Sequence, residues 1–223
     1  MKFTNHLFIS YAHIDNEQTE ENDPGWVDRF HRSLKAFLSS SIGEEAVIWR
    51  DLKLKGGDVF GEEIVSQFPK TALLVSILSP RYLKSEWCLK EIEEFCKAAE
   101  IHGGLVISNK MRAHRVMLMP LTADLLEKLP GKLNQEIGYP FYKEQEGNRF
   151  QRLDPRFGDE FKAAFNRKIA SMADQLAEII EKLEKEENPV TEPMPSGSAG
   201  SLKPGTTVSS LKNSAIDTIL ASD

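Results

Sequence analysis

The sequence predicts an α/β fold, and two observations point to it. Short apolar runs typical of strands alternate along the chain with segments whose apolar residues recur at helical spacing. The run ALLVSIL at 72–78 is apolar almost throughout, as strands are when helices cover both faces of a parallel sheet. This alternation favours a central parallel sheet of about five strands between two helical layers, a three-layer sandwich that is flavodoxin-like in outline.

The predicted strands are short apolar runs. Pro140 cannot donate a hydrogen bond to a neighbouring strand, so the run that contains it is expected at an edge of the sheet. The runs are HLFISYA at 6–12, AVIW at 46–49, ALLVSIL at 72–78, RVMLMPL at 115–121 and GYPFY at 138–142.

Helices are predicted between these runs. Trp26, Phe30, Leu34 and Phe37 lie at helical spacing in GWVDRFHRSLKAFLSS, which favours a helix after the first strand. The stretch GEEIVSQFPK at 61–70 suits a short second helix.

Capping residues indicate where the remaining two helices begin and end. Ser79 and Pro80 are a good N-cap and first helical residue for a third helix, and Gly103 is a good stop. A long last helix is expected to begin at Asp154 and Pro155 and to end near residue 187. The apolar stripe of this long helix, which predicts core packing, consists of Phe161, Phe165, Ile169, Met172, Leu176, Ile179 and Leu183.

Composition divides the chain near Asn188. Residues 188–223 contain no aromatic residue, and half of these 36 residues are Ser, Thr, Pro or Gly. Such a segment buries too little apolar surface to offset the entropy lost when its backbone is ordered. We therefore expect one domain over 1–187 and a flexible linker or tail over 188–223. A linker of this kind suggests a downstream or fused sensor domain, or a tethered partner.

Charge and cysteine content exclude several classes of function. The net charge of −6 argues against nucleic acid as a partner, because a phosphate backbone requires a basic surface. No apolar run reaches the ~20 residues that span a bilayer, so no membrane association is expected. Cys88 and Cys96 lie roughly 12 Å apart on one predicted helix, too far for a disulfide, which favours a reducing, cytoplasmic compartment. The five histidines show no metal spacing.

In parallel α/β sheets, ligands bind beyond the carboxyl ends of the strands. The loops expected there are SYAHIDNE, RDLKLKGGDVFG and SPRYLKSEW. The glycines at 56, 57 and 61 match neither dinucleotide-binding nor Walker fingerprints, so the sequence offers no phosphate-binding loop of a known kind.

A glutamate interrupts the apolar stripe of the third helix. Trp87, Glu91 and Phe95 lie at i, i+4 and i+8, which places them on one face. Helical side chains lean toward the N-terminus, so Glu91 is expected to point at the turn of Trp87 and at the crevice end of the sheet. A carboxylate half-buried beside an indole is a candidate catalytic group. The alternative is a structural glutamate that reaches solvent or caps a neighbouring loop.

Three stretches of the chain resemble TIR (Toll/interleukin-1 receptor) domains, and in particular bacterial ones. They are FISYA with Asp15 after it, IWRDLKLKGGDVFGEEI, which resembles the second strand and the so-called BB loop, and ALLVSILSPRYLKSEWCLKEI. The pattern SPxYxxSxWCxxE in the third stretch is the most specific. The resemblance covers residues 5 to about 187 and is weakest between 103 and 160.

The resemblance implies two kinds of function. Many TIR domains cleave NAD⁺ between nicotinamide and ribose, with a catalytic glutamate four positions after a tryptophan, which here is Glu91 after Trp87. NAD⁺ would be the substrate and no cofactor is implied; ADP-ribose or cyclic ADP-ribose would be the product. An ionised Glu91 would stabilise an oxocarbenium-like transition state, so strong burial of Glu91 would count against this role. The alternative is a non-catalytic interaction or adaptor module that assembles with other TIR domains through the BB loop.

Substrate-binding residues follow from the same resemblance. Tyr11, Ala12 and His13 would line the nicotinamide end, although His13 is equally consistent with an ordinary surface histidine. Arg50 and Asp51 end the second strand, and Asp51 also suits a capping role in the loop.

Two aromatic residues complete the expected site. Phe60 would stack on a ring of the substrate or anchor the short second helix. Trp87 would shield the ribose or wedge between helix and sheet. Because such domains act when assembled side by side, self-association and a role in antiphage defence or cell-death signalling are also implied.

Overall fold

The computed structural model describes residues 3–18, 21, 23–50, 62–135, 137–147 and 149–187. The chain divides into two compact units, residues 1–190 and 191–223. The predicted tail over 188–223 lies outside the described residues, so the description below concerns the first unit. Across the part of the chain that the structure describes, no helix is both long and apolar enough to cross a membrane.

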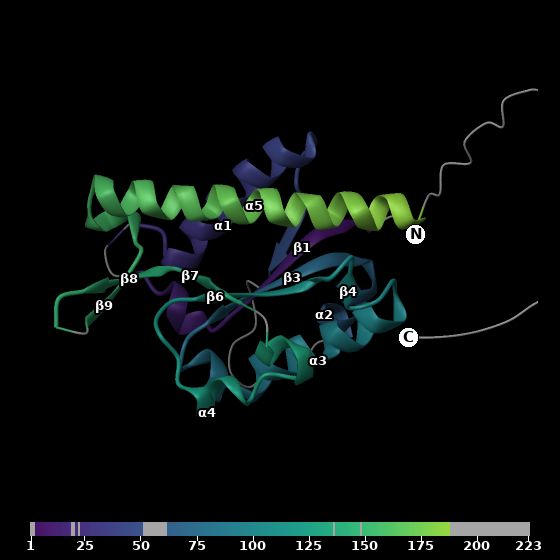
Figure 1. Cartoon of the computed structure of the whole chain (residues 1–223), viewed down its shortest axis with the longest axis horizontal. Coiled ribbons are helices and arrows are strands. Elements are labelled where there is room, and N and C mark those ends of the chain that lie inside the picture. Colours follow the sequence, from purple (N-terminus) through teal and green to yellow (C-terminus); the bar gives the residue numbers. More distant parts are fainter. Residues whose placement is uncertain are drawn as a thin grey trace, which may run out of the picture. The chain divides into compact units, whose positions relative to one another are not determined.

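A parallel sheet lies at the centre of this unit (Figure 1). Its five strands stand in the order β2-β1-β3-β6-β7, and every neighbouring pair is parallel. The predicted fold class is therefore confirmed. The strands are β1 (Asn5–Tyr11), β2 (Ile48–Arg50), β3 (Thr71–Leu78), β6 (Ala113–Met117) and β7 (Tyr139–Pro140). As expected from its proline, β7 lies at an edge.

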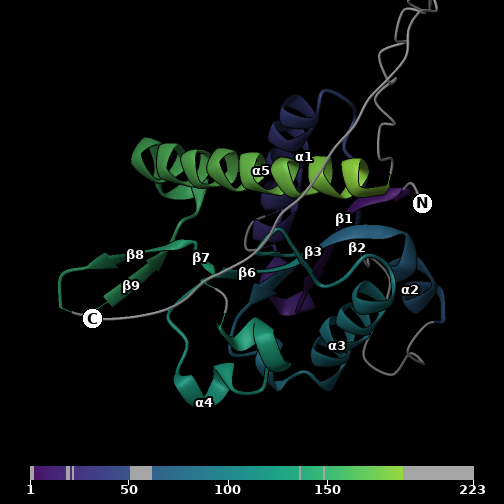
Figure 2. The same ribbon diagram turned by 45° about the vertical axis from the view of Figure 1, so that its right-hand side comes forward.

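Helices cover both faces of the sheet, as Figures 1 and 2 show. The long helix α5 (Asp159–Glu187) lies with α1 (Trp26–Ile42) on one face. The helices α2 (Glu62–Gln67), α3 (Glu86–Ile101) and α4 (Ala123–Leu126) belong to the opposite face. Each face has its own apolar core. The rings of Trp26, Phe30, Phe141 and Phe165 pack together under α1 and α5, and Phe8, Phe68 and Phe95 pack under α3.

The start of α3 differs from the prediction. Residues Tyr82–Lys84 form a short 3-10 turn, and the helix begins at Glu86 with Ser85 as its N-cap. The Ser85 hydroxyl accepts from the backbone N–H of Cys88 at 3.3 Å. Two serines six residues apart both suit an N-cap, and the Ser79 hydroxyl instead accepts from the N–H of Tyr82, the first residue of the 3-10 turn, at 3.1 Å. The helix ends at Ile101, close to the predicted stop.

The predicted start of the long helix is also wrong, for a similar reason. Asp154 and Pro155 open a 3-10 turn (Pro155–Phe157), and the Asp154 carboxylate accepts from the N–H of Arg156 at 3.1 Å. Gly158 then adopts φ +107°, which interrupts the helical path before α5 begins at Asp159. The predicted stripe from Phe165 to Leu183 is buried, as expected.

Two antiparallel hairpins were not predicted. One pairs β4 (Val106–Ile107) with β5 (Lys110–Met111), and the other pairs β8 (Tyr142–Gln145) with β9 (Arg149–Arg152). The first turns through Ser108 and Asn109, both at positive φ, which is the conformation of a two-residue hairpin turn. The fourth sheet strand also lies earlier than predicted, at 113–117 rather than 115–121.

Candidate functional site

The carboxyl ends of β1 and β3 meet the first turns of α3. Along β1, successive side chains point alternately to the two faces of the sheet. Phe8 and Ala12 pack in the core under α3, whereas Ile9 and Tyr11 pack in the core under α1 and α5. Ser10 therefore points toward α3. It stands in register with Ser76 of β3, so two buried hydroxyls lie side by side on this face.

Glu91 reaches this polar spot from α3. Its side chain is only 4 % exposed. One carboxylate oxygen, Oε2, accepts a hydrogen bond from the Ser10 hydroxyl, and the other, Oε1, accepts from the Trp87 indole N–H at 3.1 Å. Donors on both oxygens favour the ionised carboxylate, whereas the burial of Glu91 favours the protonated form and counts against the expected catalytic role. The alternative in which Glu91 reaches solvent is wrong, and its burial is deeper than the half-buried position that the sequence predicted.

Tyr82 continues the polar contacts from Ser10. Its side chain is fully buried, and its hydroxyl lies 2.6 Å from the Ser10 hydroxyl and 3.2 Å from the carbonyl oxygen of Cys88. Burial raises the pKa of Tyr82 well above its usual value, and the nearby Cys88 and Glu91 add to the shift. Tyr82 is therefore a phenol, able to donate, throughout the physiological pH range.

Cys88 is a packed thiol rather than a nucleophile. Burial raises its pKa to about 12, and the charges of Glu91 and Asp15 act in the same direction. A thiol with so high a pKa carries no thiolate near neutral pH. Its sulfur lies 3.9 Å from the carbonyl oxygen of Tyr11, so it joins the start of α3 to the end of β1.

Asp15 ties together the loops that follow β1 and β3. The Ser79 hydroxyl donates to its Oδ2 at 2.7 Å. Burial raises the pKa of Asp15, while the hydrogen bond from Ser79 and the charge of Arg152 oppose this shift. The contact fixes the two loops relative to one another at the crevice end of the sheet.

The predicted substrate-binding residues fall on both faces of the sheet. Trp87 and Ala12 lie on the face of Glu91. Tyr11 lies on the other face, with its ring 5.5 Å from that of the exposed His13. Arg50 stands beside Ile9 in the sheet and forms an ion pair with Asp28 of α1 at 2.6 Å. The structure does not bring the side chains of Tyr11 and Arg50 together with Glu91.

The other two predicted residues, Asp51 and Phe60, lie outside the described residues. Ser10, Ser76 and Tyr82 were missed. The available signal was a hydroxyl residue inside each of two apolar strands, together with a tyrosine inside the SPxYxxSxWCxxE stretch.

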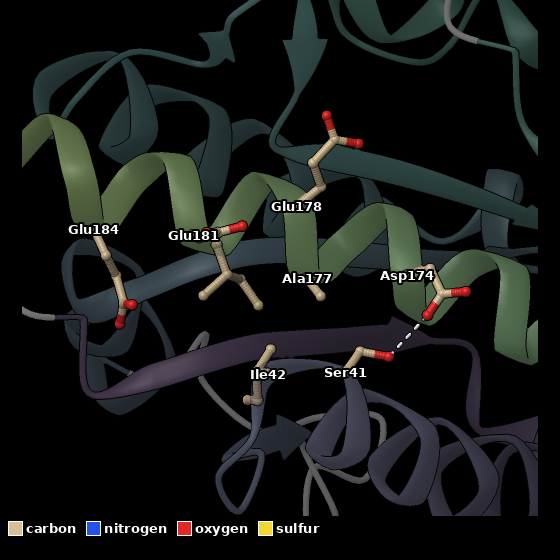
Figure 3. A pocket seen from close by; sticks show the side chains of 8 residues that line it. Ser41, Ile42, Asp174, Ala177, Glu178, Glu181 and Glu184 are labelled. Atoms are coloured by element: carbon tan, nitrogen blue, oxygen red, sulfur yellow. Dashed lines mark hydrogen bonds between the residues drawn. The ribbon is translucent and has the colours of Figure 1, made fainter.

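A separate groove of about 520 Å³ lies between the end of α1 and α5 (Figure 3). The Ser41 hydroxyl donates to Asp174 across it at 2.8 Å. Hydrogen bonds from Lys110 and Lys182 lower the pKa of Glu178 to about 2, so it is ionised. The acidic side chains on this groove would repel the phosphates of a nucleotide. Its acidic lining residues are Asp174, Glu178, Glu181 and Glu184.

A second hollow, of about 300 Å³, lies between β7 and α5 and includes Arg167 and Lys168. Within the described ranges, no cluster of three or more His, Cys, Asp or Glu side chains is arranged to hold a metal ion. Neither hollow contains Glu91 or Ser10.

Comparisons with known proteins add the following. A family model described as "TIR domain" matches residues 7–153. The search of curated proteins found no match. Among solved structures, the chain is similar to the TIR domains of the activated Roq1 resistosome, which directly recognises the pathogen effector XopQ. That similarity has 15 % sequence identity and a TM-score of 0.35, and covers 81 % of this chain and 98 % of the other.

Proposed function

Because the chain belongs to the TIR domain family, we propose that it is an NAD⁺ nucleosidase, which releases nicotinamide and leaves ADP-ribose or a cyclic ADP-ribose. The observation that carries the proposal is the place of Glu91. Its carboxylate lies one helical turn after Trp87, under the carboxyl ends of β1 and β3, where open α/β sheets bind their ligands. The family resemblance assigns the catalytic glutamate to this same position.

The chemistry requires a carboxylate rather than an acid. The bond between C1′ of the ribose and the nicotinamide nitrogen breaks, and its electron pair leaves with nicotinamide as a neutral base. Positive charge develops at C1′, as in glycoside cleavage, and water or a group of the same molecule then attacks this carbon. An ionised Glu91 would stabilise that charge and accept a hydrogen bond from a ribose hydroxyl.

The burial of Glu91 sets a condition on this function. At 4 % exposure its carboxylate touches Ser10 and Trp87 rather than open solvent, so a ribose has no free access to it in this conformation. We therefore propose that catalysis follows a rearrangement of the surrounding chain that opens a path to Glu91 while its contacts with Ser10 and Trp87 persist, and that self-association with other TIR domains drives it. The setting we propose is cytoplasmic antiphage defence or cell-death signalling, triggered through a sensor domain.

A turnover assay on assembled protein tests the function. The chain is fused to a self-assembling scaffold, incubated with NAD⁺, and the release of nicotinamide is followed by chromatography. Wild type should release nicotinamide in proportion to the loss of NAD⁺, and Glu91→Gln should lose about 10²–10³-fold of the rate. Glu94→Gln is the matched control, because Glu94 lies three residues on in the same helix but pairs with Lys97 at the surface.

The burial of Glu91 also favours a second function, a non-catalytic TIR interaction module. In that case Glu91 is a structural group that joins α3 to β1. The module would self-associate, and Glu91→Gln would weaken folding without removing any turnover. Assembled wild-type protein that leaves NAD⁺ intact would establish this second function over the first.

A further inference from the structure

We propose that Ser10 and Tyr82 are positioning residues that hold the Glu91 carboxylate in its working orientation, an inference that rests on the proposed nucleosidase function. The three side chains come from different elements: Ser10 from β1, Tyr82 from the 3-10 turn after β3, and Glu91 from α3. All three are buried. They form one connected line, from Tyr82 to Ser10 to Glu91.

The number of protons on the two hydroxyls determines which group donates to which along this line. Each hydroxyl has one proton to donate. With Glu91 ionised, as the proposed function requires, Ser10 donates to it, so Tyr82 donates to Ser10 and shares its proton with the carbonyl oxygen of Cys88. The distances agree, since the Tyr82 hydroxyl is closer to Ser10, at 2.6 Å, than to the carbonyl of Cys88, at 3.2 Å. That carbonyl lies inside α3 and has a helical N–H as partner.

The line is well suited to fixing a carboxylate. A hydroxyl that accepts from Tyr82 is polarised and becomes a stronger donor to Glu91. Ser10 lies on a strand with neighbours on both sides, β2 and β3, so its position is set by the sheet. With the Trp87 N–H on the other oxygen, the carboxylate is held at both of its atoms. A carboxylate so held needs no reorientation when positive charge develops in front of it.

Other groups that can change charge surround the line. Tyr82 and Cys88 stay protonated near neutral pH, because burial raises the pKa of both. Asp15, in the turn after β1, acts on Cys88 through its charge. On the sheet side, Arg115 of β6 stands in register with Ser76, one strand beyond Ser10, and is buried. Deletion of a neutral hydroxyl changes none of these charges, so its effect can be assigned to the line itself.

Two hydroxyl deletions test the proposal through kinetics. Ser10→Ala should lower kcat about 10- to 100-fold with KM changed less than about twofold, because the carboxylate loses its orientation while the substrate contacts stay. The acid limb of the pH–rate profile should move up by about one pH unit, because the ionised carboxylate loses a donor. Tyr82→Phe should show both effects more weakly, and Ser10→Thr should restore most of the activity. Tyr139→Phe, whose hydroxyl bonds Gln175 at the surface, is the matched control and should match wild type.

A second measurement is independent of turnover. The Glu91 carboxyl carbon is observed by NMR in protein labelled with ¹³C-glutamate and assigned by its absence in Glu91→Gln. Its titration midpoint should rise by about one pH unit in Ser10→Ala and by less in Tyr82→Phe. Unchanged midpoints in both folded variants would overturn the proposal. If assembled wild type releases no nicotinamide, the proposed function fails, and the titration alone decides whether the line orients Glu91.

Discussion

The indole N–H of Trp87 donates to the Glu91 carboxylate from one turn earlier on the same helix, with Nε1 3.1 Å from Oε1. A tryptophan four residues before a glutamate is thus more than a spacing in the sequence, because the two side chains meet. The contact gives Trp87 a role that a phenylalanine could not perform, since only the indole has a donor.

Replacing Trp87 by Phe should separate the two expected roles of the ring. If the indole N–H holds the carboxylate, Trp87→Phe should lower kcat for nicotinamide release about tenfold and leave the fold intact. Steady-state kinetics with circular dichroism would measure both. Trp49→Phe serves as a control, because Trp49 packs on Phe8 in the same layer as Trp87 and is not expected to change kcat. Equal kcat values in Trp87→Phe and wild type would mean that Trp87 contributes only packing.

Gly25, which precedes α1, should not tolerate a side chain. A Cβ at this position would lie 2.1 Å from the carbonyl oxygen of Asn16, so the turn after β1 and the start of α1 would have to separate. Gly25→Ala should lower the free energy of unfolding by about 1–3 kcal/mol. Urea unfolding would measure this loss. Ser40→Ala, at an exposed position of the same helix, should stay within about 0.5 kcal/mol of wild type.

Because of Asp154, the free energy of unfolding should change with pH in the acid range. Asp154 is fully buried, and although burial alone would raise its pKa, hydrogen bonds from Arg156 and the charge of Arg29 hold the pKa below its usual value. A carboxyl whose folded pKa is lowered stabilises the fold above its unfolded pKa, near 4, and this contribution is lost as the pH falls through the folded pKa.

The variant Asp154→Asn should therefore be less stable than wild type by about 3 kcal/mol at pH 7, because Arg29 and Arg156 lose a buried carboxylate partner, although both still pair with Asp23. Below pH 4 the difference should shrink. Thermal unfolding at a series of pH values would show this convergence. A difference that stays constant down to pH 2 would mean that the charge of Asp154 does not stabilise the fold.

Arg112 is a structural cation between the start of β3 and the end of α3. Its guanidinium is fully buried and donates to backbone carbonyls of Thr71, Ala72 and His102, at 2.9, 2.8 and 2.6 Å. Lysine cannot reproduce this fork of donors. Arg112→Lys should lower the free energy of unfolding by about 2–4 kcal/mol, since buried carbonyls lose donors. Urea unfolding would measure this loss. Arg149→Lys, at an exposed position of β9, is the control and should leave the free energy of unfolding unchanged.

The sequence was sufficient to predict the layers of the fold and the special position of Glu91. Both depend on local pattern: short continuous apolar runs for the strands, and the i, i+4, i+8 spacing that put Glu91 between Trp87 and Phe95. The edge position of β7 followed from the chemistry of Pro140 alone.

Other features depended on tertiary structure. Ser10 meets Glu91 across 81 residues of sequence, and only the packing of α3 on β1 fixes that contact. Ser79 was the predicted cap, but the path of the chain brings Ser85 rather than Ser79 to the start of the helix. The separation of Tyr11 from Glu91 could have been predicted from the sequence once Ser10 was placed beside Glu91. Tyr11 and Ser10 are neighbours on a strand, so their side chains must point to opposite faces of the sheet.

One measurement tests the central claim most directly: nicotinamide released per NAD⁺ consumed by scaffold-assembled protein, for wild type and Glu91→Gln side by side. The account predicts one nicotinamide per NAD⁺ with wild type, and a rate at least about 100-fold lower with a folded Glu91→Gln variant. Equal rates for the two proteins would contradict the assignment of Glu91 as the catalytic residue.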